Sequence, residues 1–169
     1  MSFPLFDGPC LLRDAMPLAW DSSAEPASDW EMSRYLQVLA EFEQPSELLD
    51  EKYNTQNAKL DLNLLWLARS LNTQTLGETR VTLGLEYVAW QSPQAQTLEQ
   101  KGMVLFCLSQ QFPLLLKFPA QITQCTPMDD GYCVQASWLP MSEGLLDSFE
   151  KTIFRYHRRH IHQLRERSE

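Results

Sequence analysis

The chain has 169 residues, of which 44% are hydrophobic and 21% charged, enough to bury a core of its own without disulfide bonds. Its net charge of −8 argues against general binding of DNA or RNA, because neutralising phosphates requires a surplus of Lys and Arg. No apolar run approaches the roughly 20 residues of a membrane helix. The first residues lack the basic start of a signal peptide, so we expect a cytoplasmic protein without a membrane span.

A composition rich in proline and serine distinguishes residues 1–28. Four prolines and several serines in this segment predict an extended or partly disordered lead-in with no fold of its own. Residues 29–78 are predicted to form a helical N-terminal extension. Residues 79–169 are predicted to form a β unit closed by one helix.

Two helices are predicted in the extension. The first begins at the candidate N-cap Asp29 and ends before Pro45, and its apolar face comprises Met32, Tyr35, Leu36, Leu39 and Phe42. The second, from Ala58 to Leu71, has leucines over a face wider than one contact requires. We therefore expect this helix to be buried against the β unit and its neighbouring helix, or to be shared with another subunit.

Alternating apolar and polar residues predict strands after residue 79. The segment from Val81 to Val88 has the period of two that is typical of a strand. Asp129, Asp130 and Gly131 predict a hairpin turn. Further strand-like runs are Met103–Leu108, Leu114–Thr123 and Tyr132–Trp138. Several antiparallel strands with short connections predict a small barrel or a strongly curled sheet.

A long amphipathic helix is predicted from Ser142 to the C-terminus. A coiled-coil-like seam runs along it, which predicts a homo-oligomer, and consists of Leu146, Phe149, Ile153, Tyr156 and His160. Five arginines follow between residues 155 and 167, where the negative end of the helix dipole favours them. An anion site is therefore expected near this end or at one of the few internal arginines.

The sequence contains no recognisable set of catalytic residues. The sequence lacks a P-loop, a dinucleotide fingerprint and a Gly-x-Ser-x-Gly motif, so we expect no catalytic residues and no enzyme. His157 and His160 share a helical face, but no third metal ligand is identifiable. The four cysteines have no Cys-x-x-Cys spacing and are expected to be free thiols. We therefore expect no metal and no cofactor.

The order of these segments resembles a PilZ domain, and in particular the atypical branch that is extended by helices. The resemblance is carried by Thr79–Tyr87, Leu98–Leu105, Leu114–Ile122, Asp130–Trp138 and Leu145–Arg159. It implies an α+β fold, with a small antiparallel PilZ-like β-barrel, N-terminal helices and a long C-terminal helix. It also implies a bacterial protein of cyclic di-GMP signalling, since members of the family receive this nucleotide. The added helices resemble those that the atypical branch uses for oligomerisation.

The family binds its ligand through an Arg-x-x-x-Arg segment before the first strand and an Asp-x-Ser-x-x-Gly segment within it. Gly84 matches the glycine, but Val81 stands in place of Ser and Thr79 in place of Asp. The only Arg-x-x-x-Arg spacing is Arg155 to Arg159, on the last helix. The candidate nucleotide-binding residues are therefore Arg69, Arg80, Thr82, Gly84, Arg155, Arg158 and Arg159. The alternative for these residues is an ordinary strand surface and a solvated basic helix end.

The sequence is compatible with three functions. The first is a non-enzymatic receptor or relay of cyclic di-GMP signalling, in which ligand or partner binding biases helix packing. The second is a PilZ-like oligomerisation or protein-interaction module that has lost nucleotide binding, as the altered motifs imply. The third is an enzyme on a small barrel, which requires titratable groups that converge in a pocket. We expect a protein partner in either of the first two cases.

Overall fold

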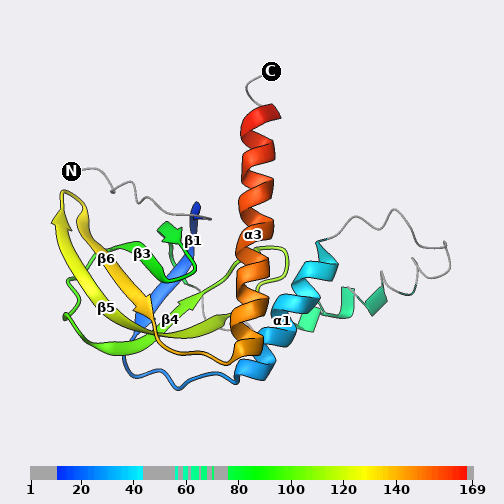
Figure 1. The fold of residues 1–169 in the computed structure, drawn as a ribbon, viewed down its shortest axis with the longest axis horizontal. Helices are drawn as coiled ribbons and strands as arrows, with labels where there is room; N and C mark the ends of the chain where they lie inside the picture. Colours follow the sequence, from blue (N-terminus) through cyan, green and yellow to red (C-terminus); the bar gives the residue numbers. More distant parts are fainter. Residues whose placement is uncertain are drawn as a thin grey trace.

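Six antiparallel strands close into a barrel in the order β1-β2-β3-β6-β5-β4 (Figure 1). The computed structural model of the protein describes residues 11–43 and 76–166, together with separate helical positions between 56 and 70. The strands are β1 (Leu12–Asp21), β2 (Glu78–Leu83), β3 (Tyr87–Ser92), β4 (Lys101–Phe106), β5 (Leu116–Met128) and β6 (Gly131–Trp138). The helices with defined bounds are α1 (Asp29–Phe42) and α3 (Glu143–Glu166). The expected α+β fold, an antiparallel barrel with a long C-terminal helix, is confirmed.

The first strand lies within the segment that the sequence analysis assigned to a lead-in outside the barrel. Residues Leu12–Pro17 pair with β2, and Leu18–Asp21 pair with β4, so β1 closes the barrel. Pro17 lies where the strand changes partners, and there its missing N–H interrupts the hydrogen-bond ladder least. The barrel therefore begins at residue 12 rather than at 79, and the helical extension is an insertion between its first two strands. The prediction for residues 1–10 lies outside the described residues.

The turn between β2 and β3 also differs from the single strand predicted over residues 81–88. The Gly84 amide donates to the Tyr87 carbonyl oxygen at 2.9 Å, which closes a tight turn. A Cβ atom at residue 84 would lie 2.9 Å from Leu11 Cδ2 and 3.3 Å from the Tyr87 carbonyl oxygen. The close approach of these atoms explains a glycine here. The hairpin turn before Gly131 is confirmed, because Met128 and Gly131 are register partners.

The helix α3 is fixed to one side of the barrel by an aromatic cluster. The Phe149 ring lies 4.9 Å from that of Phe118 and 5.9 Å from that of Trp138, in edge-to-face geometry. Phe149 and Ile153 are fully buried, whereas Leu146 is 37% exposed and His160 is exposed. Phe149 and Ile153, the central residues of the predicted oligomer seam, are therefore buried by other parts of the same chain.

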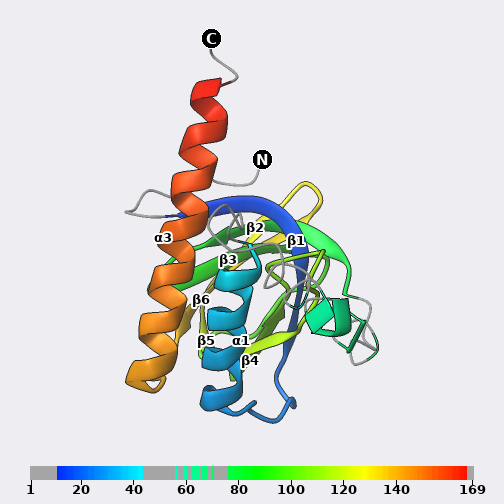
Figure 2. The same ribbon diagram turned by 90° about the vertical axis from the view of Figure 1, so that its right-hand side faces the viewer.

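The helix α1 lies beside α3 on the same side of the barrel (Figure 2). Small hydroxyl side chains let the two helices approach closely, since Ser33 Oγ lies 2.9 Å from Ser148 Oγ and donates to the Gly144 carbonyl oxygen at 3.2 Å. The Ser142 amide donates to Asp29 Oδ2 at 2.8 Å and ties the two N-terminal ends together. Within the described part of the chain, no helix is long and apolar enough to cross a bilayer.

Candidate functional site

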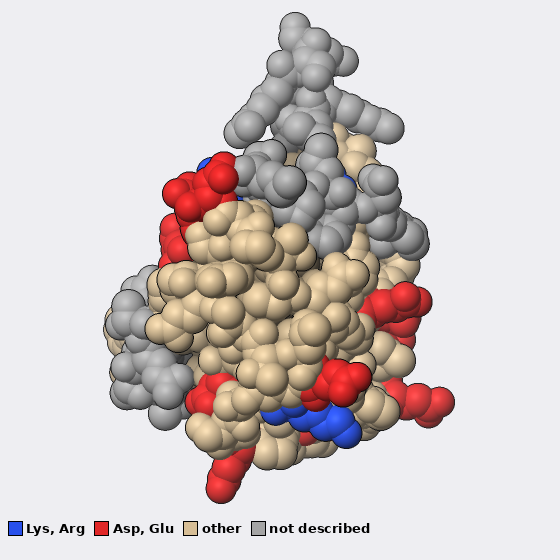
Figure 3. Space-filling view, turned by 90° about the vertical axis from the view of Figure 1, so that its left-hand side faces the viewer, with Lys and Arg blue, Asp and Glu red and all other residues tan. Residues whose placement is uncertain are grey.

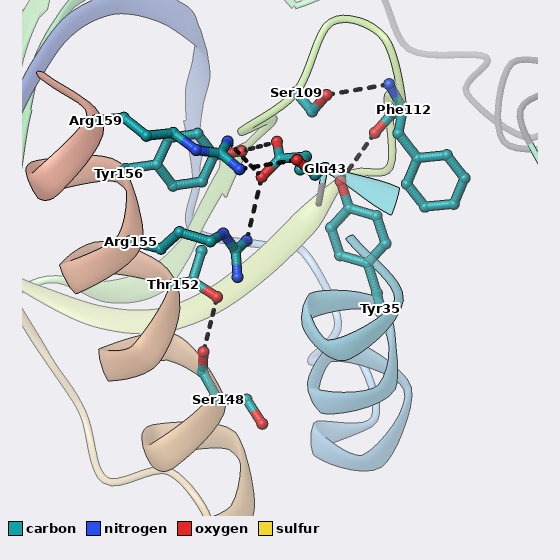
Figure 4. A network of polar contacts seen from close by, with 9 residues as sticks. All are labelled: Tyr35, Glu43, Ser109, Phe112, Ser148, Thr152, Arg155, Tyr156 and Arg159. Atoms are coloured by element: carbon teal, nitrogen blue, oxygen red, sulfur yellow. Dashed lines mark hydrogen bonds and ion pairs between the residues drawn. The ribbon is translucent and has the colours of Figure 1, made fainter. Parts of the chain in front are cut away.

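A polar network joins the C-terminal end of α1 to α3 (Figure 4). Its centre is Glu43, the C-cap residue of α1. Arg159 Nη1 donates to Glu43 Oε2 at 2.9 Å, and Arg159 Nη2 donates to the Glu43 carbonyl oxygen at 3.1 Å. The Tyr156 hydroxyl donates to Glu43 Oε1 at 2.5 Å, and Arg155 Nη2 forms an ion pair with Oε2 at 3.3 Å. Three residues from two adjacent turns of α3 thus converge on one carboxylate.

The network is largely withdrawn from water. The side chains of Glu43 and Arg155 are 13% and 19% exposed, while that of Arg159 is 40% exposed. Burial, and then the hydrogen bond to Glu43, raises the pKa of Tyr156 well above its ordinary value. The guanidinium carbons of Arg155 and Arg159 lie 5.6 Å and 5.7 Å from the Tyr156 ring centroid, which adds cation–π attraction.

The charges and hydrogen bonds of the network do not balance. One carboxylate faces two guanidiniums, which leaves a net charge of +1 among these side chains. Arg155 Nε and Arg155 Nη2 are buried and have no hydrogen-bond partner. An unsatisfied buried donor on a charged group costs more free energy than a lost neutral hydrogen bond. The site therefore has unused capacity to bind an acceptor.

Glu43 was missed by the sequence analysis, although one local signal points to it. An acidic residue at the C-terminal end of a helix faces the negative end of the helix dipole, which is unfavourable. The last turn of α1 has no basic residue to offset this. An acidic residue in that position indicates a cation from elsewhere in the fold, and only the structure shows that Arg155 and Arg159 supply it.

The candidate nucleotide-binding residues fall in two groups. Arg80, Thr82 and Gly84 lie on β2 or directly after it, and Arg80 is exposed whereas Thr82 is 2% exposed. The others lie on α3, where Arg155 and Arg159 face Glu43 and Arg158 is exposed. Arg69 lies outside the described residues. The β2 group and the α3 group therefore belong to different elements.

A shallow groove of about 470 Å³ lies beside Arg80. Its lining includes Arg80 together with Glu78 and Asp130, so acidic side chains outnumber the basic one. A second groove of about 400 Å³ shares Glu78 and Thr79 with it. The lining of the second groove includes Trp20 and Trp90, whose rings are stacked on each other. The size of both grooves is within the range of small-molecule sites. The charge of the first is unfavourable for a phosphate.

Acidic side chains predominate over basic ones among the described residues on the barrel face turned away from the helices. In Figure 3, acidic side chains appear at several separate places, whereas Lys and Arg appear mainly at one place on the lower edge. Nucleic-acid binding needs a basic stripe or patch. The described residues of this view are mostly acidic where they are charged, and they form no such stripe.

A helical segment between residues 56 and 70 exposes large apolar side chains. Leu60 is 60% exposed and Leu67 is 56% exposed, and they share one helical face with Leu64. Leu62 and Trp66 are also exposed and lie roughly 200° or more around the helix from Leu60, since each residue advances the helix by about 100°. The segment therefore has apolar residues on two nearly opposite faces. The sequence predicts that this helix is either buried against the β unit and its neighbouring helix or shared with another subunit. The exposure of these side chains contradicts burial within the chain.

The remaining candidate groups are metal ligands and cysteine thiols. Among the residues that the structure describes, no group of three or more His, Cys, Asp and Glu side chains is placed to hold a metal ion. Cys107, Cys125 and Cys133 are free, and burial raises the pKa of the Cys107 thiol. A raised pKa keeps a thiol in its less reactive protonated form.

Comparison with known proteins decides the family. The profile of the family described as "Atypical PilZ domain, cyclic di-GMP receptor" matches residues 39–166. The chain belongs to the atypical PilZ domain family. A crystal structure of a pathogenic protein from Xanthomonas campestris, described as a new tetrameric PilZ domain self-assembled via an unusual helical bundle, is similar over 93% of each chain, with 26% identity and a TM-score of 0.80. No curated protein sequence matches the chain.

Both altered motif positions are engaged within the barrel. Val81, at the serine position, is 2% exposed and points into the barrel core. The hydroxyl of Thr79, at the aspartate position, donates to the Gln91 carbonyl oxygen at 2.6 Å. Neither residue offers the free carboxylate or hydroxyl group that the motif supplies in the family.

Proposed function

We propose that this atypical PilZ protein is a non-enzymatic relay of bacterial cyclic di-GMP signalling that assembles with copies of itself through its helices. The observation that carries the proposal is the exposed apolar row of Leu60, Leu64 and Leu67, with Leu62 and Trp66 on the nearly opposite face. Large exposed apolar patches are typical of interaction surfaces. Two opposite faces would bury themselves against two neighbouring helices, which a bundle of more than two chains provides. The helical-bundle assembly of the Xanthomonas campestris protein supports this reading.

The relay would act through a protein partner in the cytoplasm. Assembly would hold several barrels and several copies of α3 in a fixed arrangement, so partner binding to one copy would influence its neighbours. The exposed part of α3, with Phe154 40% exposed, would be available to that partner or to the bundle.

The experiment that tests self-assembly uses Leu60→Glu/Leu67→Glu, with Leu98→Glu as its matched control. Leu98 is 57% exposed on the loop before β4, so the control adds the same kind of charge to an exposed leucine outside the helix. Light scattering should give a smaller mass for the double variant and an unchanged mass for the control. Equal masses for all three proteins would refute the proposal.

A second candidate function is direct reception of cyclic di-GMP. It is favoured by the family's description as a receptor. The groove beside Arg80 has a suitable size, but its lining has more acidic side chains than basic ones. Calorimetric titration separates the two candidates. Heat that saturates at micromolar nucleotide, and that is lost in Arg80→Gln, would make the chain a receptor. If the folded protein gives no heat with cyclic di-GMP, direct reception is excluded and the relay function remains.

A further inference from the structure

We propose that Arg155 and Arg159 form a site for a phosphate-bearing anion, and that the Glu43 carboxylate occupies this site as an internal substitute. The site lies on α3, apart from β2 and its altered motif. It does not depend on self-assembly, and so it goes beyond the proposed function.

The geometry of the two arginines suits a phosphate group. A separation of four residues places both guanidiniums on one face of α3, one turn apart. Guanidinium groups bind carboxylates and phosphates through paired, charge-assisted hydrogen bonds. Both already hold the same Glu43 oxygen, at 2.9 Å and 3.3 Å, so their convergence on one anionic atom is present in the fold.

A carboxylate satisfies this site incompletely. Its two oxygens are both engaged, because Oε1 accepts from Tyr156 and Oε2 contacts both arginines. Arg155 Nε is left without a hydrogen-bond partner, and Arg155 Nη2 reaches Glu43 only as an ion pair at 3.3 Å, without a hydrogen bond. A terminal phosphate, as in pyrophosphate, offers three acceptor oxygens and carries up to two negative charges, which would match the two guanidiniums, whereas each phosphodiester of cyclic di-GMP carries one charge. The free energy of the unsatisfied donors therefore favours an exchange of Glu43 for phosphate.

The position of Glu43 also favours exchange. Its carboxylate lies at the negative end of the α1 dipole, so displacement relieves an unfavourable interaction. The Arg159 side chain is 40% exposed, which leaves one side of the network open to solvent. Displacement would release the last turn of α1 from α3, and thus couple anion binding to the packing of the two helices.

The test measures binding of two probes, inorganic pyrophosphate and cyclic di-GMP, by calorimetry at fixed ionic strength. Glu43→Gln removes the competing charge, and its affinity for at least one probe should rise by about tenfold or more. Tyr156→Phe loosens Glu43 without removing its charge, and its affinity should rise by a smaller factor. Glu41→Gln is the matched control, since it removes an exposed carboxylate from the same helix, and its affinity should stay at the wild-type value.

The outcomes separate the site from its alternatives. Adding Arg155→Gln to Glu43→Gln should abolish the gain, and a gain that survives this change would place the anion elsewhere and overturn the proposal. Equal gains for both probes would identify phosphate as the recognised group, and a gain for cyclic di-GMP alone would add recognition of its bases.

Folded Glu43→Gln and Tyr156→Phe variants with wild-type affinities would overturn the proposal. If Glu43→Gln does not fold, the affinity of Tyr156→Phe alone decides. Mass measured on the same samples keeps failure of assembly distinct from failure of this site.

Discussion

Arg159 Nη1 lies 2.9 Å from Glu43 Oε2, which joins two residues that are 116 positions apart in the sequence. Together with the bond from Tyr156, this contact fixes the end of α1 against α3. Along the chain, Glu43 is the last described residue before the helical positions that carry the exposed leucines. The network therefore fixes the end of α1 from which the chain continues toward the residues that we propose for assembly.

Removing the charge of Glu43 should destabilise the protein. Glu43→Gln leaves two guanidiniums without their carboxylate in a largely buried position, so the free energy of unfolding should fall by about 2–4 kcal/mol. Urea unfolding followed by circular dichroism measures this change. The Glu41→Gln control, at an exposed position, should change it by no more than about 0.5 kcal/mol. Equal stabilities of the two variants would show that the network contributes nothing.

Replacing Gly131 by alanine should lower the free energy of unfolding, whereas replacing Gly144 by alanine should raise it. Gly131 has a φ of +114°, and a Cβ atom there would collide with the Ser92 carbonyl oxygen, so Gly131→Ala should lower the free energy of unfolding by about 2 kcal/mol or more. A Cβ at Gly144 would have nothing within 4 Å, and alanine should stabilise the first turn of α3 by about 0.5–1 kcal/mol. Thermal unfolding of both variants checks the two signs. A tolerated Gly131→Ala would contradict the turn geometry.

Stability should fall in alkali because the two buried tyrosines resist ionisation. Burial raises the pKa of Tyr35 and Tyr156 above the ordinary value of 10.0. Below pH 10 the tyrosine hydroxyls stay protonated in both the folded and the unfolded protein. Above pH 10 they ionise in the unfolded protein and stay protonated in the folded one. The folded state is then disfavoured by up to about 1.4 kcal/mol per pH unit for each tyrosine. Urea unfolding at pH 9 and pH 11 should show a smaller loss in Tyr156→Phe than in the wild type, and identical losses would contradict this account.

Much of the fold could be predicted from periodicity. The alternation along β4, β5 and β6 and the apolar face of α1 arise from local burial, which a sequence expresses directly. β1 could not be predicted in this way. Its Pro17 and its polar residues Arg13, Asp14 and Asp21 are typical of a loop, and only long-range pairing with β2 and β4 makes the segment a strand. The seam on α3 was interpreted as intermolecular because periodicity shows that Phe149 is buried but not by which surface.

Less of the candidate site could be predicted. The spacing of Arg155 and Arg159 predicted that both side chains lie on one face of the last helix, and the structure places both against Glu43. The anion that they hold, Glu43, comes from another helix, and no spacing rule connects positions so far apart. The order of Thr79, Val81 and Gly84 indicated an altered motif, and the structure adds that Val81 is inside the core.

The mass of the unmodified protein in solution tests the central claim most directly. The chain has a mass of 19.6 kDa, so sedimentation velocity across micromolar concentrations should show a species of several times that mass. Assembly on two opposite helical faces predicts more than a dimer. A species of 19.6 kDa at every concentration would contradict the account, because the leucines on the helical segment would then remain exposed to water.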